Sequence, residues 1–138
     1  MSPSYNHAYI QMNLGALFKQ MPQYSVFGEL TLTIEGADYV PDVVVYPKRP
    51  VSYHRDILRM ADMPLLIIEI LSPTQGMQEI IDKFAIYFQA GVKSCWLVQP
   101  YGQSVMVWAS PESSKHVVEG ELVDEALGLR VPLAHIFA

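Results

Sequence analysis

PLLIIEILSPTQGMQEIIDKFAIYFQAGVKSCWLV, residues 64–98, decides the fold. Residues 65–71 predict a buried strand, residues 79–90 an amphipathic helix that ends at Gly91, and residues 93–98 a second buried strand. A strand, a helix and a strand of these lengths form the right-handed parallel crossover. The stretch therefore predicts an α/β or α+β protein with a mixed β-sheet.

Length and composition limit the class of protein. A chain of 138 residues with 51% hydrophobic content fits one domain, residues 1–138, with a substantial core. The one cysteine, Cys95, lies in a predicted buried strand and has no partner for an internal disulfide, which suits a reducing cytosol. The N-terminus lacks a signal-peptide pattern, and no apolar run approaches the roughly 18 residues of a membrane span. We therefore expect a soluble, cytoplasmic protein without a membrane partner.

The charge pattern bears on nucleic-acid binding. A net charge of -5 opposes a broad electrostatic grip on DNA or RNA. Four of the nine basic residues, however, lie in one connection of twelve positions: Lys48, Arg49, Arg55 and Arg59. This connection is either a solvated loop or a surface that contacts phosphates.

The rest of the chain predicts further elements around the central stretch. Before it we expect a helix at 6–20, a strand at 26–34, a hairpin-like turn at 35–38, a strand at 40–46 and a helical turn at 54–60. After it we expect a strand at 104–109 paired with 93–98, a loop at 111–115, a small hairpin from 116–118 and 121–123, and a helical turn at 133–137. His7, near the start of the first helix, is interpreted as a helix-end or core histidine.

Two acids interrupt otherwise apolar strands: Asp42 in VPDVVVY and Glu69 in LLIIEIL. A buried carboxylate costs several kcal/mol unless it is paired or bound to a metal. Either acid alone could have a purely structural role, as a strand-end carboxylate that caps the neighbouring backbone by accepting its hydrogen bonds. Together, on adjacent strands, they could supply oxygen ligands to Mg²⁺, which takes only one or two protein carboxylates and keeps several waters. Such an ion lowers the pKa of a bound water and offsets charge on a phosphoryl group.

A third candidate is Lys83, on the flank of the buried stripe of the central helix. Its stem could pass along the sheet and bring the ammonium group near the two acids. Glu79, one turn earlier, stands at the favoured i,i+4 spacing for an ion pair with Lys83. A plain surface pair is therefore the alternative interpretation.

Four segments carry a resemblance to a known family: PDVVV at 41–45, IEILSP at 68–73, DKFAIYFQAGV at 82–92 and WLV at 96–98. Together they resemble the Uma-type family of restriction endonucleases, within the PD-(D/E)XK nuclease superfamily. The resemblance covers about residues 6–100. It implies a restriction-endonuclease-like fold, in which helices flank a central mixed sheet.

The resemblance also implies roles for particular residues. It carries the PD aspartate onto Asp42, the motif carboxylate onto Glu69, and the helix lysine of the family onto Lys83, because the superfamily position for a strand lysine is Leu71 here. The chain departs from the family in three ways: it lacks the usual N-terminal segment, it has Glu79 at the acidic position before the lysine, and its 74–77 turn has no basic residue.

These observations give three hypotheses. The first is a Mg²⁺- or Mn²⁺-dependent DNA endonuclease, in which Asp42 and Glu69 bind the metal and Lys83 positions or activates the water. The second is a non-catalytic binding or assembly module that keeps the nuclease fold, and the third is a different metal-dependent hydrolase on the same scaffold. By analogy with nucleases that cut two strands, a homodimer is expected. If the basic residues of the connection lie close to the two acids, the endonuclease hypothesis is favoured. If the Lys83 side chain points away from the acids, that hypothesis is weakened.

Overall fold

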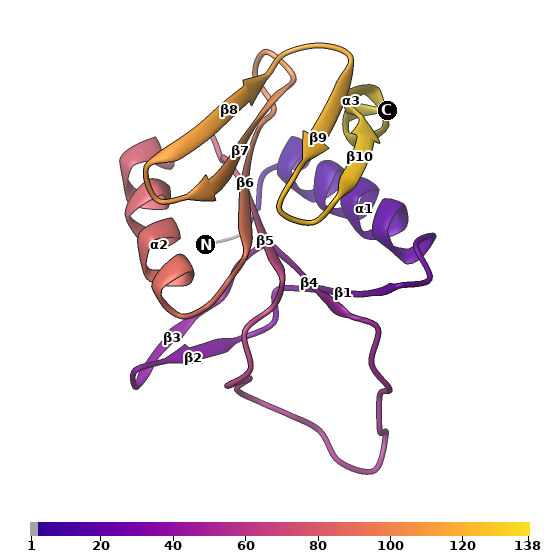
Figure 1. Cartoon of the computed structure of the whole chain (residues 1–138), viewed down its shortest axis with the longest axis vertical. Coiled ribbons are helices and arrows are strands. Elements are labelled where there is room, and N and C mark those ends of the chain that lie inside the picture. Colours follow the sequence, from indigo (N-terminus) through magenta and orange to yellow (C-terminus); the bar gives the residue numbers. More distant parts are fainter. Residues whose placement is uncertain (1–2) are drawn as a thin grey trace.

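A mixed six-stranded sheet forms the centre of the computed structural model, which describes residues 3–138 (Figure 1). Its strands, in spatial order, are β1 (Tyr24–Gly28), β4 (Val43–Pro47), β5 (Leu66–Ile70), β6 (Ser94–Gln99), β7 (Ser104–Ser110) and β8 (Ser113–Val117). Strands β5 and β6 are parallel, and the other neighbours are antiparallel. The sequence prediction of a mixed sheet is confirmed.

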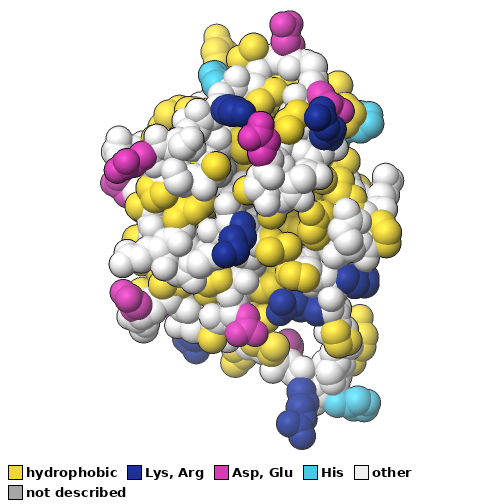
Figure 2. Space-filling view, in the orientation of Figure 1, with side chains coloured by type: hydrophobic (Ala, Val, Ile, Leu, Met, Phe, Trp, Pro, Cys, Tyr) yellow, Lys and Arg dark blue, Asp and Glu magenta, His cyan; other side chains and the backbone are white. Residues whose placement is uncertain are grey.

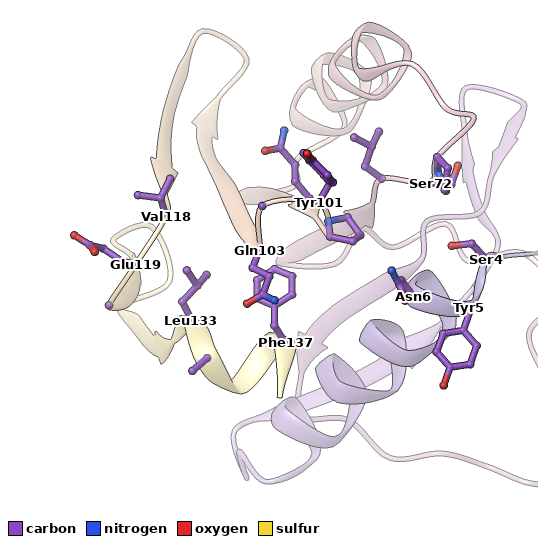
Figure 3. Close-up of a pocket in the computed structure, with 17 residues that line it drawn as sticks. Ser4, Tyr5, Asn6, Ser72, Tyr101, Gln103, Val118, Glu119, Leu133 and Phe137 are labelled. Carbon is purple, nitrogen blue, oxygen red and sulfur yellow. The ribbon is translucent and has the colours of Figure 1, made fainter.

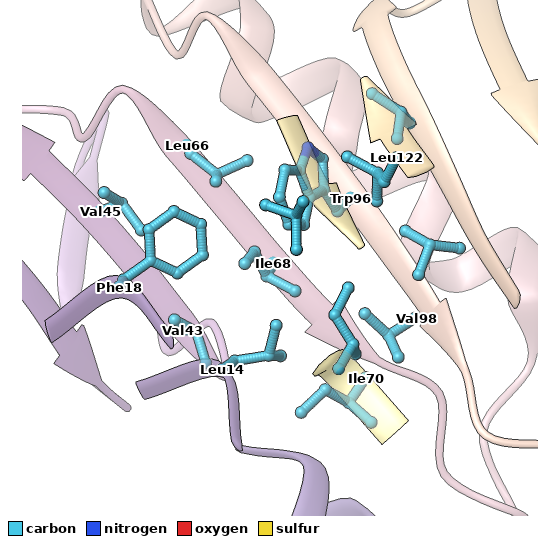
Figure 4. Close-up of a cluster of buried hydrophobic side chains, with 14 of the residues drawn as sticks. Leu14, Phe18, Val43, Val45, Leu66, Ile68, Ile70, Trp96, Val98 and Leu122 are labelled. Atoms are coloured by element: carbon cyan, nitrogen blue, oxygen red, sulfur yellow. The ribbon is translucent and has the colours of Figure 1, made fainter. Parts of the chain in front are cut away.

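Helices cover both faces of this sheet. Helix α1 (Tyr5–Lys19) lies on one face together with α3 (Leu133–Phe137) and the hairpin of β9 (Glu121–Asp124) and β10 (Leu129–Pro132), whereas α2 (Met77–Gln89) lies on the other (Figure 1). Phe18 of α1 packs against Trp96 of the sheet, and Leu14 of the same helix lies beside Val43 (Figure 4). No helix among residues 3–138 is long and apolar enough to cross a membrane.

The central crossover follows from local sequence. Ile80, Phe84 and Tyr87 form the buried stripe of α2, and the helix ends where Gly91 adopts a left-handed φ of +112°. Along β5, alternate residues face opposite sides: Ile68 joins the cluster under α1 and Ile67 the cluster under α2. The same alternation directs Glu69 to the α2 side. The predicted strand, helix and parallel strand are confirmed.

The prediction of one strand over 26–34 is wrong. The chain bends at Glu29, which has a left-handed φ of 53°, so β1 ends at Gly28 and β2 (Leu32–Ile34) leaves the main sheet to pair with β3 (Ala37–Tyr39). Side-chain alternation continues across the bend, so the pattern carries no sign of it. The predicted hairpin-like turn is confirmed at residues 35–36, whereas residues 37 and 38 belong to β3, and β4 begins at Val43 rather than at residue 40.

Two further predictions need correction. Residues 54–60 form no helical turn but an irregular segment with bends. Its last residue, Met60, exchanges backbone hydrogen bonds with Thr31 and Thr33, at 2.9 and 3.0 Å, and so ties the end of the segment to β2. The predicted loop at 111–115 contains the start of β8, which pairs with β7.

The predicted hairpin of 116–118 with 121–123 does not form. Strand β9 turns away and pairs with β10, because Leu122 and Asp124 are buried under the α1 face. Asp124 accepts hydrogen bonds from Ser94 Oγ, from Trp96 Nε1 at 2.8 Å and from the Leu127 N–H at 3.1 Å. This buried carboxylate ties the C-terminal hairpin to β6.

Candidate metal centre

The two predicted acids meet where β4 begins and β5 ends. In the antiparallel register Val43 lies opposite Ile68, so one step further places Asp42 opposite Glu69. The Asp42 N–H donates to Glu69 Oε1 at 3.0 Å, and the Ile70 N–H donates to Asp42 Oδ2 at 2.7 Å. Each carboxylate is thus held by the backbone of the neighbouring strand.

Glu69 is buried, with 6% of its surface exposed. Burial first, and then the negative charge of Asp42, raise its pKa from 4.5 to about 8. The hydrogen bond from the Asp42 N–H and the positive charge of Lys83 act in the opposite direction. Without a further cation, therefore, this acid pair retains a proton near neutral pH.

His7 is a member of the site that the sequence interpretation missed. Its Nε2 lies 3.0 Å from Asp42 Oδ2, and its Nδ1 is buried with no hydrogen-bond partner among the described residues. His7 is a buried helix residue, as expected, but it also contacts the acid pair. The sequence contains a signal for this position, since the helical spacing of His7, Ile10 and Leu14 puts the histidine on the face of α1 that packs against the sheet.

Lys83 lies within electrostatic range of the acids. Its side chain is 35% exposed, and its Nζ is 4.0 Å from Glu79 Oε1, so the i,i+4 pair exists at a long distance. Its charge lowers the pKa of Glu69. Lys83 therefore pairs with Glu79, as the surface-pair interpretation expects, and also lies close enough to Glu69 to lower its pKa, as the site interpretation expects.

The basic connection does not converge on the acids. Lys48, Arg49, Arg55 and Arg59 lie between the end of β4 and the start of β5, at the opposite end of these strands from Asp42 and Glu69 (Figure 1). Basic side chains gather on the lower part of the molecule, where this connection lies (Figure 2). Arg59 Nε donates to Asp38 Oδ2 at 2.8 Å, and the Arg49 guanidinium stacks over the Tyr46 ring at 4.1 Å.

The donor set of the acid pair fits Mg²⁺ or Mn²⁺. The backbone and histidine contacts described above use Asp42 Oδ2 and Glu69 Oε1. The two carboxyl groups also hydrogen-bond to each other while they share a proton, and once that proton is lost their remaining oxygens are hard donors. Within residues 3–138, no group of three or more His, Cys, Asp and Glu side chains is placed to hold a metal ion. Two carboxylates are nevertheless enough for an ion that keeps most of its waters. Such an ion would also relieve the repulsion between the two carboxylates.

The sheet and its flanking helices define a mixed α+β protein, and the two acids lie at neighbouring ends of two of its central strands. The chain belongs to the Uma2 family, described as "Putative restriction endonuclease", which matches residues 1–134. The resemblance stated from the sequence is thereby confirmed.

One solved structure is similar over nearly the whole chain. It is described as a "putative nuclease belonging to DUF820" from Anabaena variabilis ATCC 29413, and it shares 23% sequence identity with a TM-score of 0.79. The match covers 99% of this chain and 83% of that one. No curated protein matches. The family supports a nuclease role for the chain, and the solved structure supports the fold.

Proposed function

We propose that this protein is a Mg²⁺- or Mn²⁺-dependent endonuclease that hydrolyses phosphodiester bonds in DNA. The observation that carries the proposal is the contact between Asp42 and Glu69 at the ends of two central strands, with Glu69 buried and its pKa raised to about 8. Strongly perturbed carboxyl groups in contact with each other are typical of functional sites. Family membership supports nuclease chemistry for this pair.

Asp42 and Glu69 would hold the ion through their remaining oxygens. The ion would supply an activated water and offset charge on the phosphoryl group. His7 and the Ile70 N–H fix Asp42 Oδ2, and the Asp42 N–H fixes Glu69 Oε1, so both ligands are oriented before the ion binds. Lys83 would favour the ionised form of Glu69 and orient the attacking water.

The basic connection would hold the DNA at a distance from the cleaved bond. Asp42 immediately precedes the five residues of β4, so five steps, or roughly 16 Å at about 3.3 Å per residue, separate it from the end of β4 where the connection begins. This spacing corresponds to about five base steps at roughly 3.4 Å each. Lys48, Arg49, Arg55 and Arg59 would thus contact phosphates that flank the scissile one. Cleavage of both strands would need two sites, which a homodimer would supply.

A non-catalytic binding or assembly module is the second candidate. Two observations favour it: the net charge of -5, and the ion pair that Lys83 forms with Glu79. This candidate requires neither metal binding nor a lysine directed at the acids.

Calorimetry and cleavage together separate the two candidates. Mg²⁺ and Mn²⁺ are titrated into the wild type, Asp42→Ala and Glu69→Ala, with Glu121→Ala as the control because Glu121 is an accessible carboxylate paired with Arg130. The same proteins, and Lys83→Met, are assayed on plasmid and branched DNA. The nuclease proposal expects metal binding that both acid variants lose and the control keeps, and cleavage that also needs Lys83. Absence of binding by the wild type at millimolar metal would refute it and favour the module.

A further inference from the structure

A large groove opens where β5 and β6 end. It has a volume of about 1310 Å³, and the first turn of α1, the segment after β5, the β6–β7 turn, the segment after β8 and α3 form its walls (Figure 3). Typical small-molecule sites have roughly 300–1,000 Å³. The groove is therefore large enough for part of a polymer.

The groove adjoins the candidate metal centre through two segments of chain. Ser72, in its wall, follows Glu69 by three residues, which is at most about 11 Å along an extended backbone. Asn6, also in the wall, immediately precedes His7, whose ring contacts Asp42. A nucleotide next to a phosphate bound at the acids would thus reach the groove.

The charge of the groove does not suit phosphates. Of its seventeen lining residues, all within the described part of the chain, Glu119 is the one with a formal charge. A surface that tracks the nucleic-acid backbone requires Lys or Arg. The groove consequently suits the uncharged parts of a nucleotide, which are the sugar and the base.

The polar groups of the groove suit base edges. Asn6, Gln99 and Gln103 place side-chain amides in its wall, and an amide can pair with a base through a donor and an acceptor together. Ser104 Oγ donates to Gln99 Oε1, and the Gln99 amide nitrogen has only a 3.9 Å contact with Met106 Sδ, so this nitrogen can still donate to a ligand. Among the side-chain hydrogen bonds between described residues, none involves Asn6 or Gln103.

An aromatic side chain stands at the rim of the groove. Tyr101 is 98% exposed and projects from the β6–β7 turn, in which Gly102 and Gln103 both adopt left-handed φ angles of 88° and 51°. Exposed aromatic rings that flank amide groups are typical of surfaces on which unpaired bases stack. A base inside an intact duplex has no free face for such stacking.

We infer that this groove binds unpaired nucleobases of the DNA strand whose phosphate lies at Asp42 and Glu69. The inference rests on the proposed function and refines it: the preferred substrate has unpaired nucleotides next to the scissile bond, as in single-stranded, forked or branched DNA. The amides contact the base edges and Tyr101 stacks on a base face.

The test measures binding without cleavage, by fluorescence anisotropy with Ca²⁺ in place of Mg²⁺, so that a cation at the acids lets the phosphate approach. Three labelled probes share one sequence: a short single strand, the same strand with abasic positions at its centre, and the blunt duplex. The proteins are the wild type, Tyr101→Ala, Asn6→Ala and the control Tyr9→Ala, which removes an exposed tyrosine (55%) of α1 that lies outside the groove lining and outside the basic connection. All three substituted side chains are exposed, so the variants should fold, and circular dichroism checks this.

We expect the single strand to bind more tightly than the abasic strand. Tyr101→Ala should weaken single-strand binding roughly tenfold and duplex binding little, since the loss of one stacked base has an effect of this size. Equal binding of the normal and abasic strands, or a Tyr101→Ala protein that binds like Tyr9→Ala, would overturn the inference even if the protein cleaves plasmid DNA. Base-dependent binding through Tyr101 by a protein that cleaves nothing would support the groove and refute the proposed function.

Discussion

Glu69→Gln is the substitution that tests the acid pair most directly. A glutamine has the shape of a protonated glutamate: its Oε1 can still accept from the Asp42 N–H, and its amide nitrogen can donate to the Asp42 carboxylate. The substitution therefore removes the titration of residue 69 while it preserves the packing.

The sign of the effect on stability follows from proton binding. Between pH 4.5 and about 8 the folded protein retains a proton on Glu69 that the unfolded chain has released, so the free energy of unfolding falls as the pH rises through this window. One unit of pKa corresponds to about 1.4 kcal/mol, so the metal-free wild type should lose on the order of 5 kcal/mol from this residue. Glu69→Gln should lose none of it.

Urea unfolding from pH 4.5 to 9 in EDTA measures this difference. The wild type and Glu69→Gln should have similar stability at pH 4.5, and the variant should be more stable by a few kcal/mol at pH 9. Glu121→Gln, a change at an exposed carboxylate, should follow the wild type at every pH. Mg²⁺ at 100 times its Kd should add about 2.7 kcal/mol to the wild type and nothing to Glu69→Gln.

Two results would refute this reasoning. If the difference between the wild type and Glu69→Gln stays constant with pH, Glu69 titrates in its ordinary range and is not the buried, repelled group described above. If Mg²⁺ stabilises both proteins equally, the ion binds elsewhere.

Three further predictions concern other parts of the chain. Lys83→Met should lower the rate of DNA cleavage by at least roughly 100-fold, which is the lower end of the effect of a residue that assists proton transfer. Metal affinity, measured by calorimetry, should change little. Loss of both cleavage and metal binding would mean that Lys83 supports the fold of the site. Asp124→Ala should destabilise the protein by about 3 kcal/mol in urea unfolding, because it leaves the buried hydrogen-bond donors of Ser94 and Trp96 in β6 unpaired. The control Glu125→Ala, which removes an exposed ion pair, should lower the free energy of unfolding by less than about 1 kcal/mol. Equal effects of the two substitutions would contradict a stabilising role for the buried Asp124 hydrogen bonds. Replacement of Arg55 by Ala should reduce the salt dependence of duplex binding by about one counterion, and an unchanged slope would remove it from the DNA interface.

The elements that were predicted correctly are those whose signals are local. The crossover of β5, α2 and β6 is contained in one stretch of sequence, with an apolar strand, a helical period and a terminal glycine in order. Strand β9 was assigned to the wrong partner, because its pairing with β10 depends on the burial of Leu122 and Asp124 under the α1 face, which no local pattern encodes.

The same distinction between local signals and tertiary packing applies to the residues of the candidate site. Asp42 and Glu69 were recognisable because each interrupts an apolar strand, and their contact follows once the two strands pair. His7 was assigned to the core, and that is half of its role: the contact with Asp42 joins residues 35 positions apart, and it exists only when α1 packs across the start of β4. The roles assigned to Asp42, Glu69 and Lys83 stay predictions until metal binding and cleavage are measured.

The net charge of -5 and a nuclease role are compatible because the charges of this protein are segregated. The acids lie at one end of β4 and β5, and the cationic connection lies at the other, roughly 16 Å away at about 3.3 Å per residue. A field of this kind repels DNA from the acids unless a cation is bound there, and attracts it to the connection.

Metal binding would therefore have a second effect besides the activation of water, since the ion would neutralise the carboxylates and so permit the phosphate to approach. It follows that DNA affinity should rise when Mg²⁺ is added to the wild type and stay unchanged in Asp42→Ala. A protein that bound DNA equally well with and without the ion would be using the connection alone, as a non-catalytic module would.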